Sequence, residues 1–369
     1  MLGEGVGGTT TQGVPMLTES QKLLIVVLAE EILRPKAHDA DEAAAYPPDL
    51  IAKATELGIT AINIPEEFDG IAEHRSTVTN ALVAEAMAYG DMGLALPLLA
   101  PSGVATTLTQ FGSDAQQKTY LPEFAGESVP ASAVVVSESR PLFDPFTLQT
   151  TAVREGEELV LTGVKALVPG AADAELFIVG ALLDGQPRLV IVEPGAEGLQ
   201  VEDDPAMGVR AAKTARLHLE GVRVPASNLL GTTEDHLDAV RRARLAWAAA
   251  AVGTGQAAFD HVSEYVQERK AFGEPIGYRQ AVAFTVADMA IEIDALRLVV
   301  WKAAARLDRG EDASAEIAQA RSLTSQYLTQ VGSNGVQLLG GHGFVKEYDN
   351  ERWYRDLRGA GVLEGSLLV

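Results

Sequence analysis

The sequence contains no cysteine, which excludes disulfide bonds, thiolate metal sites and cysteine nucleophiles. This lack of disulfides fits a cytoplasmic location. Basic residues are also scarce, because 29 Lys and Arg stand against 51 Asp and Glu and leave a net charge of −22. An acidic chain repels phosphate backbones and anionic lipid, so neither nucleic acid nor a membrane is an expected partner. The six His residues are scattered, and no metal site is expected.

Long apolar runs are missing near the start of the chain. The run from Leu23 to Ala29 is interrupted by two glutamates and is too short to cross a bilayer. Residues 1–17 are rich in Gly and Thr and carry no basic region. We expect them to form a disordered tail and not a signal peptide.

The 369 residues, 47% of them apolar, can bury a sizeable core but exceed one simple core. Three segments differ in their pattern. Residues 18–128 have helical periodicity broken by Gly and Pro, and they predict an N-terminal helical domain. Residues 129–233 contain short alternating stretches bounded by Gly, Pro or Asp, which predict a small antiparallel sheet or barrel. Residues 234–369 are rich in Ala with long apolar stripes, which predict a helical bundle.

Several strings, in order and in register, resemble the acyl-CoA dehydrogenase family. They are GITAINIPEE (58–67), FGSDAQQK (111–118), GVRVP (221–225), RKAFGEPI (269–276), QLLGGHG (337–343) and ERWYRD (351–356). Each string alone is weak, but together they cover nearly the whole chain. The resemblance implies a mainly α fold, with an N-terminal α domain, a middle β domain and a C-terminal four-helix bundle.

The resemblance also implies an activity. Members of the family oxidise the Cα–Cβ bond of an acyl-CoA thioester to the 2-enoyl-CoA: a carboxylate takes the α-proton and the β-hydrogen leaves as hydride to FAD. The implied partners are the acyl-CoA, an electron-transfer flavoprotein as acceptor, and further family members in a dimer or tetramer. Some of these assemblies are mixed and act on bulky steroid side chains. Acyl chain length and branching are not readable from the motifs.

Glu364 is the candidate catalytic base. It lies eight residues after Asp356 in the string VLEGS, which matches the family's common base position, and its neighbours are apolar. An apolar setting would desolvate a carboxylate, as a base for a weakly acidic proton requires. Other members carry the base on the first bundle helix, at a position that is Ala243 here. The next residue, Arg244, is expected either to shape the substrate side or to pair with an acid on the helix surface.

The flavin contacts implied by the resemblance are kept in one half of the site. In the family, the matching Arg, Phe, Gln and Gly-Gly positions reach the pyrophosphate and adenosine of the neighbouring subunit's FAD. A diphosphate favours a guanidinium fork and closely approaching backbone N–H groups. These positions are Arg269, Phe272, Gln337, Gly340 and Gly341.

The other half of the flavin site is eroded. Ser137 can replace the family's Thr hydroxyl at the flavin ring, and Ser366 is the matching contact in the Glu-Gly-Ser string. However, the Gly-rich segment is replaced by residues 140–143, and the family's Trp and hydroxyl positions are Leu167 and Pro169. Two interpretations remain open. Either the site has drifted and still holds FAD, or this chain completes the flavin site of a different partner subunit and has a weak or absent flavin site of its own.

Three rival functions follow from the same residues. An acyl-CoA oxidase or flavin monooxygenase would share the fold and differ in oxygen access. A non-catalytic partner subunit would hold no flavin alone. A helical scaffolding protein would have no need of the flavin-contacting strings.

Overall fold

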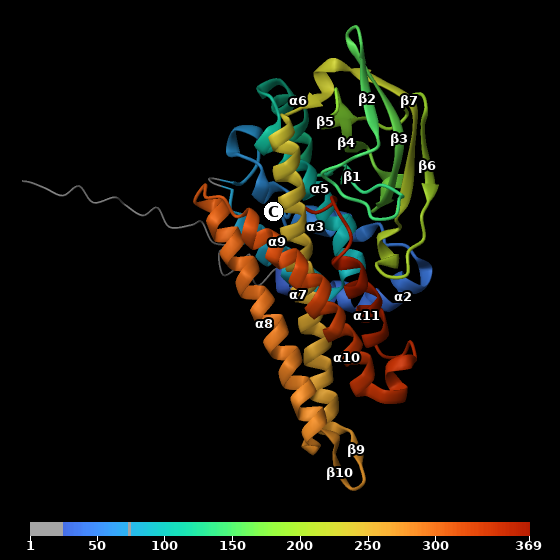
Figure 1. Cartoon of the computed structure of the whole chain (residues 1–369), viewed down its shortest axis with the longest axis vertical. Helices are drawn as coiled ribbons and strands as arrows, with labels where there is room; N and C mark the ends of the chain where they lie inside the picture. Colours follow the sequence, from blue (N-terminus) through green and yellow to red (C-terminus); the bar gives the residue numbers. More distant parts are fainter. Residues whose placement is uncertain (1–24, 73–74) are drawn as a thin grey trace, which may run out of the picture.

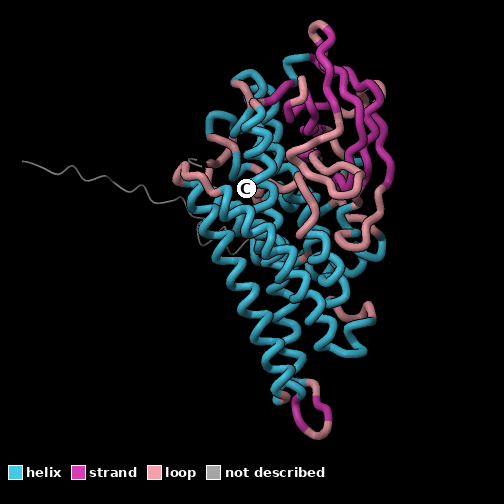
Figure 2. Tube along the Cα trace, viewed as in Figure 1, coloured by secondary structure: helices cyan, strands magenta, loops and turns pink. Residues whose placement is uncertain are grey.

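Helices occupy the two ends of the chain and a β-sheet occupies its middle. The computed structural model describes residues 25–72 and 75–369. In Figures 1 and 2 the sheet lies at one end of the molecule and the long helices of the bundle extend away from it. The predicted disordered tail, residues 1–17, lies outside the described residues.

The first group of helices begins at residues with clear capping chemistry. Asp91 accepts a hydrogen bond from the N–H of Leu94 at the start of α5. Ser113 and Gln116 form a capping box at the start of α6. A short 3₁₀ turn spans Glu66–Phe68. The helices are a π-helical turn (Leu28–Leu33), α2 (Arg34–Ala43), α3 (Asp49–Glu56), α4 (Thr77–Gly90), α5 (Met92–Phe111) and α6 (Asp114–Ala125).

Helix α5 is long and apolar enough to cross a membrane by length and composition. However, 94% of its apolar window is buried inside the protein. It is therefore the central helix of the core. It packs against α4, α6 and β1, as well as against α7 of the bundle described below.

The middle strands form one twisted sheet. The strands are β1 (Ser132–Val135), β2 (Thr151–Glu155), β3 (Glu158–Val168), β4 (Leu176–Leu183), β5 (Gln186–Val192), β6 (Leu199–Asp203), β7 (Ala215–Pro225) and β8 (Leu229–Leu230). Their order is β6-β7-β3-β2-β4-β5-β8, and β1 pairs with β4. Most strand pairs are antiparallel, as predicted, but β1 and β2 both run parallel to β4, which was not predicted. Loops connect these distant strands, and local alternation does not report such pairings.

The C-terminal helices form the bundle. They are α7 (Thr233–Glu268), α8 (Gln280–Asp308), α9 (Ser314–Leu323), α10 (Thr329–Leu339) and α11 (Asn350–Ala360). A π-helical turn (Thr324–Leu328) joins α9 to α10, and a small hairpin of β9 (Lys270–Ala271) and β10 (Glu274–Pro275) follows α7. The 36-residue α7 is about 54 Å long. It runs from the sheet to the far end of the molecule (Figure 1).

Helix α7 holds the parts of the molecule together. A Cβ added at Gly253 would lie 1.9 Å from the carbonyl oxygen of Glu85 on α4, so only glycine allows the two helices to approach this closely. One apolar core joins α4 and α5 to the bundle, and a second joins α5, α6 and the start of α7 to the sheet. The candidate site lies between these two cores.

Candidate functional site

The structure brings four of the predicted site residues together at the junction of bundle and sheet. Glu364 and Ser366 belong to residues 361–369, which follow α11 and run back between β1, α5 and α7. Arg244 lies on α7, and Ser137 lies two residues after the end of β1. In Figure 1 the end of the chain lies among the helices and not at the periphery.

The Glu364 carboxylate is held by two guanidinium groups. Arg244 Nε donates to both carboxylate oxygens at 3.0 Å, and its Nη2 donates to Oε1 at 2.8 Å. Arg321 Nη2, from α9, donates to the same Oε1 at 2.9 Å. The second nitrogen of Arg321, Nη1, donates to the carbonyl of Ala360 at 3.0 Å. The Glu364 side chain is only 4% exposed.

This environment corrects one expectation about the base. Glu364 is buried together with Leu363, Leu367 and Leu368, whereas its fourth apolar neighbour, Val362, is 65% exposed. Its carboxylate, however, contacts two cations and not an apolar wall. A buried carboxylate is costly unless charged donors satisfy it, and here charge-assisted hydrogen bonds do so. Burial lowers the pKa of Arg321, and the carboxylate of Glu364 opposes that effect.

Arg244 has the acid partner that one of its two expected roles requires, while its role on the substrate side stays a prediction. It pairs with an acid, but that acid is the candidate base, and its guanidinium also lies over the ring of Phe146 at 4.9 Å. Arg321 was not predicted. The sequence feature that could have indicated Arg321 is its spacing, because it lies four residues after the buried Ile317 on α9, where an apolar residue is expected.

The segment that carries Glu364 is attached to the sheet and to α7 through its backbone. Ser137 Oγ donates to the carbonyl of Glu364 at 3.0 Å, and the indole N–H of Trp247 donates to the carbonyl of Gly365 at 2.9 Å. The N–H of Ser366 donates to the carbonyl of Val134 at 2.7 Å. Gly365 has φ of +74°, a conformation that favours glycine. The Glu-Gly-Ser string therefore fixes a tight turn against β1.

The residues after this turn fill the space between α4, α5 and α7. Leu367, Leu368 and Val369 are 2%, 5% and 1% exposed. Ser366 lies so close to α5 that a Cβ at Gly103 would be 2.6 Å from its carbonyl oxygen. A cavity of only about 20 Å³ remains beside them. An acyl chain therefore has no room here until the segment moves.

The ring half of an FAD site is engaged in contacts within the chain. The Ser137 hydroxyl, which the resemblance assigns to the flavin ring, donates its proton to the backbone carbonyl of Glu364 at 3.0 Å. Lys165 is committed to structure as well, because its Nζ donates to the carbonyl of Val136 and to Glu138. Burial lowers the pKa of Lys165 to about 8. A flavin ring would require the segment that carries Glu364 to leave Ser137.

The distal half fits better. Arg269 ends α7, Phe272 lies in the hairpin that follows, and Gln337, Gly340 and Gly341 lie at the end of α10. All five are exposed, and Phe272 is 95% exposed. A Cβ at Gly340 or Gly341 would meet nothing within 4 Å, so the backbone is open to a ligand. Arg269, at the end of α7, lies about 25 residues after Arg244, which corresponds to about 37 Å along the helix. That distance separates the two predicted halves too far for one FAD within one chain.

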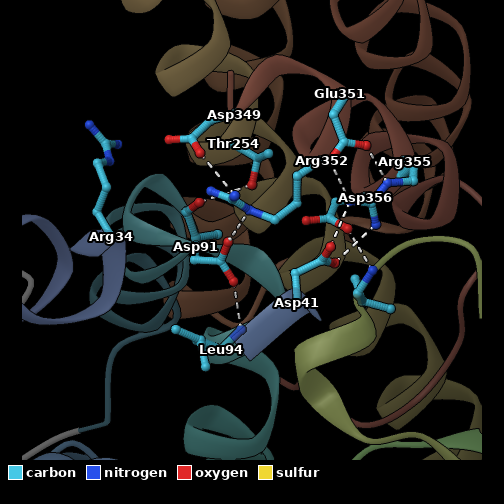
Figure 3. A network of polar contacts seen from close by, with 12 residues as sticks. Arg34, Asp41, Asp91, Leu94, Thr254, Asp349, Glu351, Arg352, Arg355 and Asp356 are labelled. Carbon is cyan, nitrogen blue, oxygen red and sulfur yellow. Dashed lines mark hydrogen bonds and ion pairs between the residues drawn. The ribbon is translucent and has the colours of Figure 1, made fainter. Parts of the chain in front are cut away.

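The ERWYRD string forms an ionic cluster whose contacts join parts of the structure to one another. Arg352 Nε donates to Asp91 Oδ2 at 2.9 Å, and Arg355 pairs with Asp41 at 2.8 Å (Figure 3). Asp356 accepts the N–H of Val209 at 2.5 Å. Burial, together with the charge of Asp91, raises the pKa of Asp356 to about 7. The cluster ties α11 to α2, to α5 and to the loop before β7.

His342 holds the turn of residues 340–343 in place through two contacts. Its Nδ1 lies 2.8 Å from the hydroxyl of Tyr265 on α7. Its ring stacks on Tyr348 with ring centroids 4.9 Å apart. These contacts hold the Gly-Gly-His-Gly turn against the bundle and so set the direction of the exposed glycines.

Comparison with known proteins gives matches along the chain. The model of the acyl-CoA dehydrogenase N-terminal domain matches residues 22–128, that of the middle domain residues 133–222, and that of the C-terminal domain residues 236–367. A probable acyl-CoA dehydrogenase of Bacillus subtilis, YngJ, is 34% identical over 366 residues, covering 95% of each chain. The cyclohex-1-ene-1-carbonyl-CoA dehydrogenase of Geobacter metallireducens is 31% identical, again covering 95% of each.

Solved structures agree. Butyryl-CoA dehydrogenase of Megasphaera elsdenii superposes with a TM-score of 0.86 at 28% identity, covering 94% of both chains. A chain from a structure reported for the electron transferring flavoprotein of Acidaminococcus fermentans gives a TM-score of 0.86 at 30% identity, covering 94% of both. The predicted fold is thus confirmed. With all three domain models matched and relatives above 30% identity along nearly its whole length, this chain belongs to the acyl-CoA dehydrogenase family, an oxidoreductase family whose members are FAD flavoproteins.

Proposed function

We propose that this chain takes part in the FAD-dependent α,β-dehydrogenation of an acyl-CoA thioester to the 2-enoyl-CoA, with Glu364 as the base. The observation that carries the proposal is the buried Glu364 carboxylate, held in a defined direction at the junction of α7 and the sheet. The nearest alternative position for a base, Ala243, has no ionisable group.

In this proposal the residues of the chain carry out one proton transfer, from Cα of the substrate. A carboxylate oxygen of Glu364 accepts the proton from Cα, while the Cα–H electron pair becomes the new double bond. FAD, when bound, supplies the acceptor for the hydride that leaves Cβ. Before the proton transfer, residues 367–369 vacate the space between α4, α5 and α7 so that the acyl chain can lie beside Glu364. Arg244, between the base and solvent, lies where it can guide the thioester.

The electron acceptor that we propose is an electron-transfer flavoprotein. Support comes from the family and from the Acidaminococcus fermentans structure, whose reported subject is such a protein. The substrate class is an acyl-CoA, as the names of the butyryl-CoA and cyclohexene-carbonyl-CoA relatives indicate for those proteins.

A second candidate function is a partner subunit in a mixed assembly, with a steroid side-chain substrate as one example. Two observations favour it. The Ser137 hydroxyl already donates to the backbone carbonyl of Glu364, and the distal residues Arg269 and Phe272 are exposed at the far end of α7 from Glu364. In this arrangement the chain would complete the FAD site of a different family member in a dimer or tetramer.

One experiment separates the two. The chain is purified alone, and bound FAD per protomer is measured from the flavin absorbance. About one FAD per protomer supports a self-sufficient oligomer, and little FAD that is restored by adding a second family member supports the mixed assembly.

Glu364→Gln tests the base in whichever assembly holds FAD. Loss of a general base costs about 10²- to 10⁴-fold, so turnover should fall at least 100-fold with FAD content unchanged. Glu85→Gln is the control, because Glu85 is a partly buried glutamate that is also paired with an arginine, Arg297, at 2.8 Å. Wild-type turnover in Glu364→Gln would refute the role of Glu364.

A further inference from the structure

Arg321 differs in its contacts from the buried Arg352. Arg352 joins one helix to another, and its acid partner Asp91 caps α5. Arg321, whose side chain is 14% exposed, instead joins α9 to a nine-residue segment without regular structure, and its acid partner already has a full ion pair with Arg244. One guanidinium is enough to balance one carboxylate. A second guanidinium on the same carboxylate needs another explanation, because withdrawing a charge from most of its water is costly.

The geometry of Arg321 supplies that explanation. One amino group bonds the carbonyl of Ala360, the last residue of α11, and the other bonds the Glu364 carboxylate. The guanidinium thus spans the four-residue connection between the end of the helix and the base. The planar guanidinium has donors in fixed directions. It therefore holds the Ala360 carbonyl and the Glu364 carboxylate at a fixed separation, in addition to neutralising charge.

A second contact from the same helical stretch supports the connection. Ser325 lies one turn after Arg321, in the π-helical turn, and a Cβ at Gly361 would be 2.7 Å from its Cα. Gly361 and Glu364 are therefore both set by one face of this stretch. π-Helical turns inside α-helices are often found at functional sites, where they redirect side chains.

We propose that Arg321 is a positioning residue for the base: it fixes the connection between α11 and Glu364, and thereby the direction of the carboxylate. This inference rests on the proposed role of Glu364. Arg244 approaches the carboxylate from α7 and Arg321 approaches it from α9, so the carboxylate has one orientation and not a range of rotamers. From the side of the sheet, the contacts with this segment are to its backbone: the Ser137 hydroxyl donates to the Glu364 carbonyl, and the Val134 carbonyl accepts the Ser366 N–H.

The test compares Arg321→Met and Arg321→Lys with wild type in the FAD-loaded assembly. Displacement of a reacting group by about 1 Å can cost 100-fold in rate. We expect kcat of Arg321→Met to fall by about 10- to 100-fold, with KM and FAD content changed less than about threefold. Arg321→Lys should recover part of the loss, and guanidinium ion added to Arg321→Ala should also restore activity.

Arg297→Met is the matched control. Arg297 is 16% exposed against 14% for Arg321, and it pairs with Glu85 far from the base, so its loss should leave kcat nearly unchanged. A kcat within twofold of wild type in Arg321→Met would overturn the proposal. So would an equal loss in Arg297→Met, since that would indicate a general effect on the bundle.

A measurement without substrate separates this inference from the proposed function. Hydrogen–deuterium exchange of the peptide 361–366 should be at least tenfold faster in Arg321→Met than in wild type, and unchanged in Arg297→Met. Unchanged exchange refutes the positioning role whatever the activity. If exchange rises but Glu364→Gln retains turnover, the proposed base is wrong while the structural link of Arg321 to the segment holds.

Discussion

Replacing Arg352 by Met should destabilise the protein strongly, because it leaves a carboxylate buried without its cation. The Arg352 side chain is 4% exposed and that of Asp91 is 1% exposed, so water cannot take the place of the lost donor. Removing one partner of a buried ion pair costs about 3–5 kcal/mol. The pair of Arg352 with the half-exposed Asp349 adds little. We therefore expect a loss of about 4 kcal/mol in the free energy of unfolding.

The loss should depend on pH. Burial raises the pKa of Asp91 even with Arg352 present, and without Arg352 the protonated form is favoured further. At low pH the folded variant can neutralise Asp91 by protonation, whereas at pH 8 it must bury the charge or break the contact. The deficit of Arg352→Met should thus be larger at pH 8 than at pH 5. Urea unfolding followed by circular dichroism at both pH values measures it.

Asp91→Asn in the same chain is the companion change. Asn can still accept the N–H of Leu94 and cap α5, but it carries no charge that needs Arg352. The double variant should recover most of the stability lost in Arg352→Met. A deficit below about 1 kcal/mol, or one that does not shrink at pH 5, would refute the reasoning.

Three further changes probe other parts of the molecule. Gly103→Ala places a Cβ 2.6 Å from the carbonyl of Ser366 and should displace that segment, seen as a red shift in Trp247 fluorescence; an unchanged spectrum would contradict this. The pKa of Asp356 is raised to about 7 in the folded protein. A carboxyl group whose pKa is higher in the folded state than in the unfolded state makes the protein less stable as the pH rises from about 4 to about 7. Asp356→Asn should therefore gain stability relative to wild type between pH 5 and pH 8, and the opposite trend in urea midpoints would show that the sign is wrong. Arg269→Met removes an exposed side chain, so unfolding should change by less than about 0.5 kcal/mol while bound FAD falls; equal FAD content would argue against the distal contact.

Much of the local structure was predictable, because its causes lie within a few residues. The capping box of Ser113 and Gln116 starts α6, and Gly112 follows the last residue of α5. Apolar spacing placed Met289, Ile293 and Leu296 in the core of α8, and all three are buried. The motif strings predicted the family, because they keep residue type and spacing along the chain.

The sheet was predictable only in part. Alternating stretches marked β3, β4, β5 and β7, but β1 was missed because it is buried on both sides and does not alternate. The parallel pairing of β1 and β2 with β4 joins residues far apart in the sequence, such as Ser132 with Leu176. The alternation of apolar and polar residues predicts which face of a strand is buried, but it does not predict which strands pair with it.

The site shows the same division. Glu364 was identified from its spacing to Asp356, yet its partners lie 120 residues away at Arg244 and 43 away at Arg321. Ser137 was expected at a flavin ring, and in the structure it lies against Glu364, 227 residues later in the chain. No local pattern reports contacts of this length.

By itself, the sequence determined the helices, the order of the segments, the family and the identity of the candidate base, since each depends on residue type and short spacing. Only the tertiary structure decided that two arginines hold Glu364, that residues 367–369 fill the space beside it, and that the two halves of the predicted flavin site lie at different ends of α7. Those features arise from packing between distant segments, where burial and charge compensation, and not local propensity, select the arrangement.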